Sequence, residues 1–212
     1  IHQVRGYDIS NMSIIETSAG RVIVDPLTAR ETAARALALV NRELGERPIV
    51  AVIYTHSHLD HFGGVEAVID PADVATGKVR AIAPIGLMKE SLSENALAGP
   101  AMGRRAQYMY GATLSRSPRS HVDTGLGKNP AIGAASIIAP TDNIDHTGQT
   151  LEIGGVQFIF QYVPDSEAPA ELTFFLPQLH AWCGAEIVSH TMHNLYTLRG
   201  AKVRDALKWS GY

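Results

Sequence analysis

Three histidines and an aspartate lie within the six residues His56-Ser57-His58-Leu59-Asp60-His61, directly after the apolar run 49–54. Imidazole nitrogen and carboxylate oxygen are good zinc ligands. His56 and His58 are two residues apart, so their side chains lie on the same side of an extended segment. Asp60 and His61 follow where the chain must turn, and the glycines at 63–64 permit a tight turn over the site. One stretch can therefore supply ligands to two adjacent metals. A solvated histidine-rich loop is the weaker alternative, because chance rarely places so many ligand types directly after a buried strand.

Composition narrows the class of protein. The 212 residues are 45% hydrophobic and 18% charged, which is typical of a globular chain. No apolar run approaches the roughly 18 residues that a membrane span needs. The net charge of −3 leaves no basic stripe for nucleic acid. Cys183 is the only cysteine, so an internal disulfide is excluded, which does not decide the compartment.

The order of periodic segments predicts an α/β fold with helices outside sheets. The run 111–145 has no clear periodicity and is rich in Gly, Ser, Pro and Asn, which indicates a covering loop with a functional role. Helices are predicted at 29–44, 84–96, 102–109 and 203–209, and a further helix is predicted to begin at 65–69. Strands are predicted at 13–17, 21–24, 49–54, 79–83, 149–153, 156–162, 172–176 and 180–182.

The histidine motif, placed after a buried strand and a strand–Asp25–helix unit, resembles the metallo-β-lactamase fold superfamily. The segments 101–105, 167–171, 185–186 and 193–205 look like its alkylsulfatase branch, the zinc-dependent enzymes that act on detergents such as dodecyl sulfate. The resemblance implies a four-layer αβ/βα sandwich, here incomplete. It also implies a binuclear zinc hydrolase that cleaves alkyl sulfate esters to alcohol and inorganic sulfate.

The resemblance further implies a ligand set for two Zn²⁺ ions per chain. His56, His58 and Glu167 match ligands of one zinc, Asp60 and His61 match ligands of the second, and Glu186 matches a carboxylate that bridges both. The family places one more histidine in a segment that would follow Tyr212.

The resemblance also sets expectations for the whole protein. Residues 1–212 are expected to form a catalytic domain truncated at both ends. The dimerisation and lipid-carrier-like domains that follow in full-length relatives are not part of it. The full-length protein is expected to be a homodimer. Similarity favours a periplasmic or secreted protein, and a cytoplasmic one is compatible with the sequence.

The residues alone leave alternatives open for the two distant carboxylates and for Asp25. After the strand 156–162, either Glu167 or Glu171 can face the site, and either can be a solvated loop acid; only the resemblance favours Glu167 as the ligand. Glu186 reads otherwise as a surface glutamate. Asp25 either hydrogen-bonds a zinc-binding histidine and fixes its tautomer, or caps the following helix.

Substrate residues are predicted in two segments. Arg199 is the candidate sulfate binder, because a guanidinium fork matches two oxygens of a tetrahedral anion; a surface arginine is the alternative, and Arg204 with Asp205 reads as an ion pair. His190 or His193 is the candidate proton donor to the leaving alcohol, with Asn194 beside them. The second segment offers backbone N–H groups to an anion, and a plain turn is equally compatible; it comprises Asp123, Thr124, Gly125, Leu126 and Gly127.

Two rival functions fit the same motif. One is another hydrolase on this scaffold, such as a thioesterase, lactonase or lactamase, against which Arg199 and the segment 194–205 argue. The other is an inactive metal-binding fragment.

Overall fold

Strand β4 lies inside a six-stranded sheet of mixed direction. The computed structural model describes residues 1–127, 129–189 and 193–212. The first three strands pair antiparallel, and the third to the sixth pair parallel. In spatial order they are β1 (His2–Val4), β2 (Met12–Glu16), β3 (Arg21–Val24), β4 (Ile49–Ile53), β5 (Arg80–Pro84) and β6 (Asp142–Ile144).

A second, antiparallel sheet packs face to face on the first. Gly154 and Gly155 turn its first hairpin with φ of 55° and 80°, as the sequence predicts. Its strands, in the order β10-β9-β8-β7, are β7 (Thr150–Ile153), β8 (Val156–Tyr162), β9 (Leu172–Leu176) and β10 (Ala181–Cys183).

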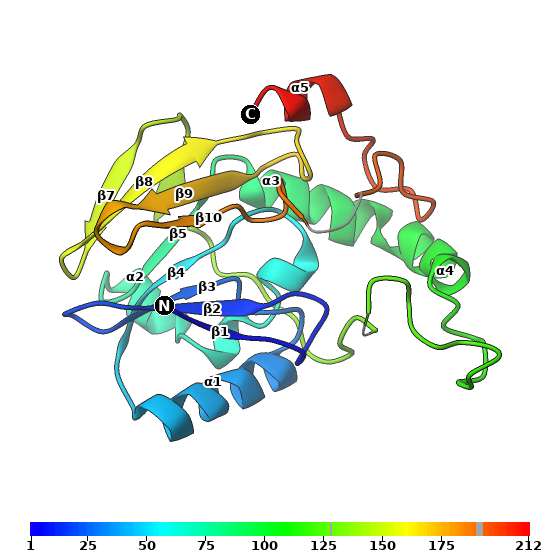
Figure 1. Ribbon diagram of the computed structural model, residues 1–212, viewed down its shortest axis with the longest axis horizontal. Helices are drawn as coiled ribbons and strands as arrows, with labels where there is room; N and C mark the ends of the chain where they lie inside the picture. The colour runs from blue at the N-terminus through cyan, green and yellow to red at the C-terminus, as the bar shows by residue number, and fades with distance from the viewer. Residues whose placement is uncertain (128, 190–192) are drawn as a thin grey trace.

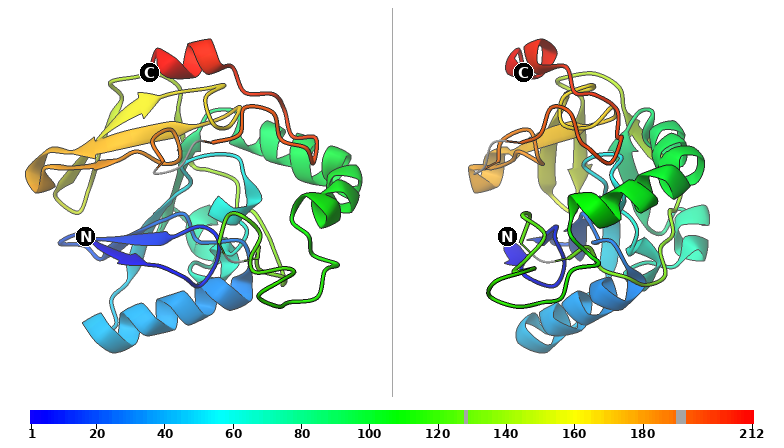
Figure 2. Two further views of the ribbon diagram at one scale, coloured as in Figure 1. Left: turned by 45° about the vertical axis from the view of Figure 1, so that its right-hand side comes forward. Right: turned by 90° about the vertical axis from the view of Figure 1, so that its right-hand side faces the viewer.

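Helices cover the outside of this sheet pair (Figure 1). Helices α1 and α2 lie on the first sheet, and α5 lies on the side of the second sheet that faces away from the first (Figure 2). A continuous helical arm, in which α3 passes through the π-helical turn η3 into α4, runs along one end of both sheets. The bounds are α1 (Arg30–Leu44), α2 (Pro71–Ala75), α3 (Leu87–Leu92), η3 (Ser93–Ala98), α4 (Gly99–Met109) and α5 (Ala206–Ser210), with 3₁₀ turns η1 (Leu59–His61), η2 (Val65–Ala67) and η4 (Pro177–Leu179).

Two hydrophobic clusters fix these layers. Strand β3 serves both, because Ile23 faces the helices while Val22 and Val24 face the second sheet. The cluster between the sheets includes the mutually packed rings of Phe158, Phe160 and Phe174, with centroids 5.5 to 6.2 Å apart. Burial on both faces explains why β4 and residues 22–24 of β3 are continuous apolar runs rather than alternating ones.

The carboxyl ends of the parallel strands meet at one edge, where the histidine motif follows β4. Gly63 and Gly64 then bring the chain back against the start of α1. A Cβ on Gly63 would lie 2.1 Å from the carbonyl oxygen of Thr28, and one on Gly64 would lie 2.3 Å from that of Pro26. Only glycine permits this approach, as the sequence predicts for a tight turn over the site.

The predicted elements are recovered with four differences. The helix predicted to begin at 65–69 is the 3₁₀ turn η2, which the separate helix α2 follows. Strands β1 and β6 are missed by the sequence, and β6 lies inside the run 111–145, for which the sequence predicts loop throughout. The helix predicted over 84–96 begins at Leu87 and widens into η3, and the last helix is confined to Ala206–Ser210. Among the described residues, none of the helices combines the length and the apolarity that crossing a bilayer demands.

Glu16→Gln should destabilise the protein in a pH-dependent way. The buried Arg21 donates to Glu16 Oε1 at 2.7 Å, and Arg47 pairs with Oε2. Although burial raises the pKa of Glu16, these hydrogen bonds outweigh it and hold that pKa below its ordinary value of 4.5. We expect the variant to lose roughly 1–2 kcal/mol of unfolding free energy at neutral pH, reduced from the value for a fully buried pair because Glu16 is partly exposed.

Because the folded-state pKa is lowered, the stabilisation is complete above the unfolded pKa near 4.5 and is lost as the pH falls through the folded pKa. Urea denaturation across this range should show the two proteins converging in acid. Glu43→Gln, at an exposed pair with Arg42, is the control. A difference that persists unchanged in acid contradicts the assigned charge.

Candidate metal centre

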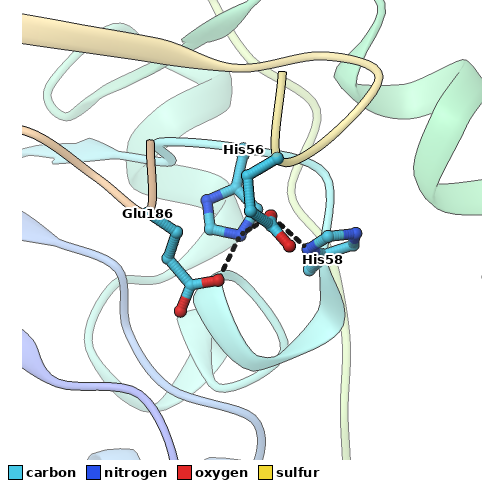
Figure 3. Close-up of side chains that lie close together, drawn as sticks. His56, His58 and Glu186 are labelled. Atoms are coloured by element: carbon cyan, nitrogen blue, oxygen red, sulfur yellow. Dashed lines mark ion pairs between the residues drawn. The ribbon is translucent and has the colours of Figure 1, made fainter. Parts of the chain in front are cut away.

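Four side chains from three separate segments aim their ligand atoms at one point near the end of β4. Glu167 Oε2 lies 2.9 Å from His58 Nδ1 and 3.6 Å from His56 Nε2, and Glu186 Oε2 lies 3.8 Å from His56 Nε2. Figure 3 shows the carboxylate of Glu186 pointing toward the ring of His56, with His58 on the far side. These four residues form a group whose ligand atoms lie within 4.8 Å of one another.

A second group lies beside the first and shares Glu186 with it. His61 Nε2 is 3.2 Å from Asp60 Oδ2 and 3.4 Å from Glu186 Oε1. The two oxygens of Glu186 therefore face one histidine each, His56 and His61, whose rings are 3.9 Å apart between centroids. This is the arrangement of a carboxylate that can join two neighbouring ions.

Two of the three histidines have a polar neighbour on the other ring nitrogen. Thr55 Oγ1 is 2.8 Å from His56 Nδ1, and Asp25 Oδ2 is 2.8 Å from His61 Nδ1. Asp25 also accepts from the Thr55 backbone N–H at 2.8 Å and from its hydroxyl at 2.7 Å. Asp25 thus orients His61 directly and His56 through Thr55, which is the tautomer-fixing role that the sequence offers as one alternative.

Three non-glycine residues with left-handed backbone accompany this cluster. Asp25 has φ of 56°, Asp165 has 62° and lies two residues before Glu167, and Ala185 has 47° and directly precedes Glu186. Such conformations cost roughly 1–3 kcal/mol each and persist where surrounding contacts determine the backbone. Here they direct three carboxylates toward the histidines.

Burial and neighbouring charges shift the pKa values of His56 and His58 in opposite directions. Burial lowers the pKa of His56, and the neighbouring His61 and His58 lower it further. Burial also acts to lower the pKa of His58, but Glu167 outweighs it and raises that pKa to about 9. For Glu167, burial raises the pKa, yet His58 and the hydrogen bond from His193 hold it well below its usual range. A cation that binds here therefore meets an ionised carboxylate and displaces a proton from His58.

The donor set fits a divalent metal ion. His56 Nε2, His61 Nε2 and Glu167 Oε2 are buried and, among the described residues, have no hydrogen-bond partner. Orphaned buried polar atoms are costly and call for an ion or water. All three face the shared cluster, and imidazole nitrogen with carboxylate oxygen is a metal-binding combination.

Two expectations about neighbouring charged residues are wrong. Glu171 is not a solvated loop acid, because it is fully buried and accepts from Ser166 Oγ and the Ala168 N–H. Burial raises its pKa to about 8, with Glu167 adding to the effect. Arg204 does not pair with Asp205; it pairs with Glu167, and Asp205 caps α5 by accepting from the Lys208 N–H. The partner of Arg204 is a long-range contact that local sequence does not encode, whereas Glu171 is satisfied by groups of its own loop.

The predicted substrate residues differ in how closely they contact this cluster. Arg199 is half-buried and donates to the Tyr110 hydroxyl at 3.2 Å, while its other terminal nitrogen is 3.7 Å from Glu94 Oε1. The second oxygen of Glu94 is 3.7 Å from His58 Nε2. Glu94 therefore connects Arg199 to the candidate ligand His58. Glu94 is not identified from the sequence.

His193 and Asn194 precede Arg199 in the same predicted substrate segment. His193 Nε2 lies 2.8 Å from Glu167 Oε1, so the structure brings it to the cluster. The side chain of Asn194 is exposed, and its carbonyl oxygen accepts from Arg204. His190 lies outside the described residues.

The segment 123–127 forms a closed turn. The N–H groups of Thr124, Gly125 and Leu126 are directed to the Gly127 carbonyl, the Asp123 carboxylate and the Thr124 hydroxyl, respectively. These bonds agree with the alternative of a plain turn, and anion binding there stays a prediction. His121, just before this turn, contacts the carbonyl of Tyr110, which links the loop to the partner of Arg199.

Comparison with known proteins extends over the whole chain. The sequence profile described as the metallo-beta-lactamase superfamily matches residues 5–160. A linear primary-alkylsulfatase of Pseudomonas sp is 49% identical over 212 residues, which is 100% of this chain and 32% of the relative. The alkyl/aryl-sulfatase BDS1 of Saccharomyces cerevisiae is 48% identical over 100% of this chain and 33% of its own length. The chain thus spans about a third of the curated relatives it matches.

Solved structures of an alkylsulfatase and of a metallo-beta-lactamase have backbones similar to that of this chain. The stereoselective inverting sec-alkylsulfatase Pisa1 from Pseudomonas sp. superposes with a TM-score of 0.94 and 46% identity, over 99% of this chain and 33% of that one. A metallo-beta-lactamase from Pontibacter korlensis shares the fold alone, with a TM-score of 0.56 and 19% identity over 94% of this chain and 69% of that one.

Asp25→Asn should weaken metal binding while leaving the fold intact. Asparagine tolerates the positive φ at this position, but its amide would present N–H groups to His61 Nδ1. The proton on His61 would then move to Nε2, the nitrogen that faces Asp60 and Glu186. We expect metal affinity to fall by about 10- to 100-fold, measured by competition with a chelating dye. Asp70→Asn, at the N-cap of α2, is the matched control, and equal affinities in all three proteins would contradict the role of Asp25.

Proposed function

This chain belongs to the metallo-beta-lactamase superfamily, and we propose that its 212 residues are the metal-binding catalytic domain of an alkylsulfatase. The reaction is hydrolysis of an alkyl sulfate ester to an alcohol and inorganic sulfate. The observation that carries the proposal is 46–49% identity to three alkylsulfatases along the full chain, with a ligand-like cluster at its centre. Homodimerisation of the whole protein stays a prediction.

Two Zn²⁺ ions are the proposed cofactors. The group His56, His58, Glu167 and Glu186 offers four donors to one ion, and the group Asp60, His61 and Glu186 offers three to the other. Zinc in hydrolases takes such imidazole and carboxylate donors, and the group with three donors would leave a position for water or substrate. Three carboxylates partly offset the charge of two divalent ions. When bound, zinc supplies a Lewis acid that activates water and offsets the negative charge of the sulfate group.

The residues of this chain bind and orient the substrate around that centre. Arg199 offers a planar fork to two sulfate oxygens, and the Tyr110 hydroxyl and Glu94 hold that fork in place. Glu94 also faces His58, so the anion-binding side chain and a metal ligand share one carboxylate. His193 contacts Glu167 through Nε2, which supports a role in holding that carboxylate; protonation of the leaving alcohol by His190 or His193 stays a prediction.

Zinc content and turnover should be lost together in His58→Ala. The purified chain is expected to carry two zinc ions and to release inorganic sulfate from dodecyl sulfate. His58 supplies Nδ1 to the first group, so its removal should abolish both, as elemental analysis and sulfate detection would report. His146→Ala, at an exposed histidine paired with Asp145, is the control.

The same assay distinguishes the two alternative functions, another hydrolase of this fold and an inactive metal-binding domain. Turnover of a thioester or a lactam without turnover of dodecyl sulfate would show that alkyl sulfates are the wrong substrate class. One zinc ion without sulfate release would identify an inert metal-binding domain.

Arg199→Ala should impair catalysis and leave the metal in place. Loss of a positioned donor to a developing anion typically lowers kcat by about 10²- to 10³-fold. We expect that loss in kcat/KM for dodecyl sulfate with the zinc content unchanged. Arg42→Ala, at an exposed arginine on α1, serves as control. Loss of zinc from Arg199→Ala would assign Arg199 to the ligand scaffold instead.

A further inference from the structure

Arg204 is a buried arginine, and each of its three guanidinium nitrogens has a partner next to the candidate metal centre. Its Nε donates to the carbonyl oxygen of Glu167 at 2.6 Å, and its Nη2 pairs with the Oε1 of the same residue. Its Nη1 donates to the carbonyl oxygen of Asn194 at 2.8 Å, and its own backbone N–H donates to the carbonyl oxygen of Leu195 at 2.9 Å. The residue is only 7% exposed, so these bonds lie in a low-dielectric environment.

The two carboxylate oxygens of Glu167 have different surroundings. Oε1 is occupied by Arg204 and by His193 Nε2 at 2.8 Å. Oε2 is buried without a hydrogen-bond partner among the described residues and faces His58 Nδ1 at 2.9 Å and His56 Nε2 at 3.6 Å. The carboxylate is therefore held in one orientation from behind, with a single oxygen left for an ion.

We propose that Arg204 is the positioning residue for Glu167, which it fixes as a one-oxygen ligand of the first metal. The inference rests on the metal-binding part of the proposed function. Arginine suits this task because its rigid fork grips the main chain and the side chain of Glu167 at once, which a lysine ammonium cannot do. Partners that orient ligands in this way typically contribute 10- to 100-fold in metal affinity.

The same side chain joins the ligand to the substrate segment. Its Nη1 bond to the Asn194 carbonyl, together with the bond from the Arg204 backbone N–H to the Leu195 carbonyl, closes the segment 194–204 into a loop, and Arg199 lies within that loop. Arg204 thus tethers the loop that carries the candidate sulfate binder to a candidate ligand 37 positions away in the sequence. Metal occupancy and the order of this loop are expected to be coupled through Glu167.

Arg204→Lys tests the proposal by zinc affinity, measured by competition with a chelating dye on the full chain. We expect the affinity for the first zinc to fall by about 10- to 100-fold. Arg21→Lys is the matched control, because Arg21 is also buried and grips Glu16, Asn41 and Leu44 in the scaffold. That variant should lower the melting temperature of the metal-free protein without changing zinc affinity.

A double substitution separates positioning from a general structural role. In a Glu167→Ala background, Arg204→Lys should cause no additional loss of zinc affinity, because the residue it acts through is gone. An equal additional loss in both backgrounds overturns the proposal. Wild-type affinity in Arg204→Lys overturns it as well, whereas a wild-type chain that binds no zinc refutes the proposed function itself.

Hydrogen exchange on the wild-type chain gives a readout that needs no variant to fold. Zinc should slow exchange at the Arg204 amide, which bonds to Leu195, because Glu167 would be fixed from both sides. Control amides are those of the β7–β8 hairpin beside the turn at 154–155, at the opposite end of β8 from the loop that carries Glu167, and they should be unaffected. Zinc binding with unchanged exchange at Arg204 overturns the coupling.

Discussion

Buried acids and imidazoles packed within a few ångströms are the constraint around which this structure is organised. Glu167 and His56 are almost completely excluded from water, and ionised groups in such surroundings need partners of opposite charge or hydrogen bonds. The surrounding chain provides partners on one side of each group: Thr55 and Asp25 behind His56 and His61, and Arg204 behind Glu167. On the inner side, His56 Nε2, His61 Nε2 and Glu167 Oε2 have no hydrogen-bond partner among the described residues, and a cation would satisfy all three atoms together.

The fold makes this convergence possible. Strands β3 and β4 are buried on both faces, so their carboxyl ends are rigidly placed, and Asp25 and the histidine motif follow directly from them. The second sheet brings Glu167 and Glu186 to the same edge from loops after β8 and β10, and the isolated pairing of His56 with Glu171 fastens the two halves together. The ligands from the two sheets meet because the hydrophobic contact between the sheets fixes their separation.

The sequence predicts what is local and leaves undetermined what is distant. The histidine motif lies in six consecutive residues, so its chemistry follows from the amino-acid sequence alone. The choice between Glu167 and Glu171 depends on which side chain turns toward the histidines, and only the family resemblance favours Glu167. The sequence assigns Arg204 to the wrong partner, because Glu167 lies 37 positions earlier in the chain. The short strands β1 and β6 are missed because three residues carry too little periodicity to be recognised.

The π-helical turn η3 has a geometric effect beyond its own six residues. A π turn holds an extra residue relative to an α-helical one, so it widens the helix where Glu94 reaches toward His58 and Arg199. It also sets the rotational phase of everything that follows, including Tyr110 at the end of α4. One residue corresponds to about 100° of rotation in an α-helix. Shortening the turn by a single residue would therefore swing Tyr110 away from Arg199, although neither Tyr110 nor Arg199 had been substituted.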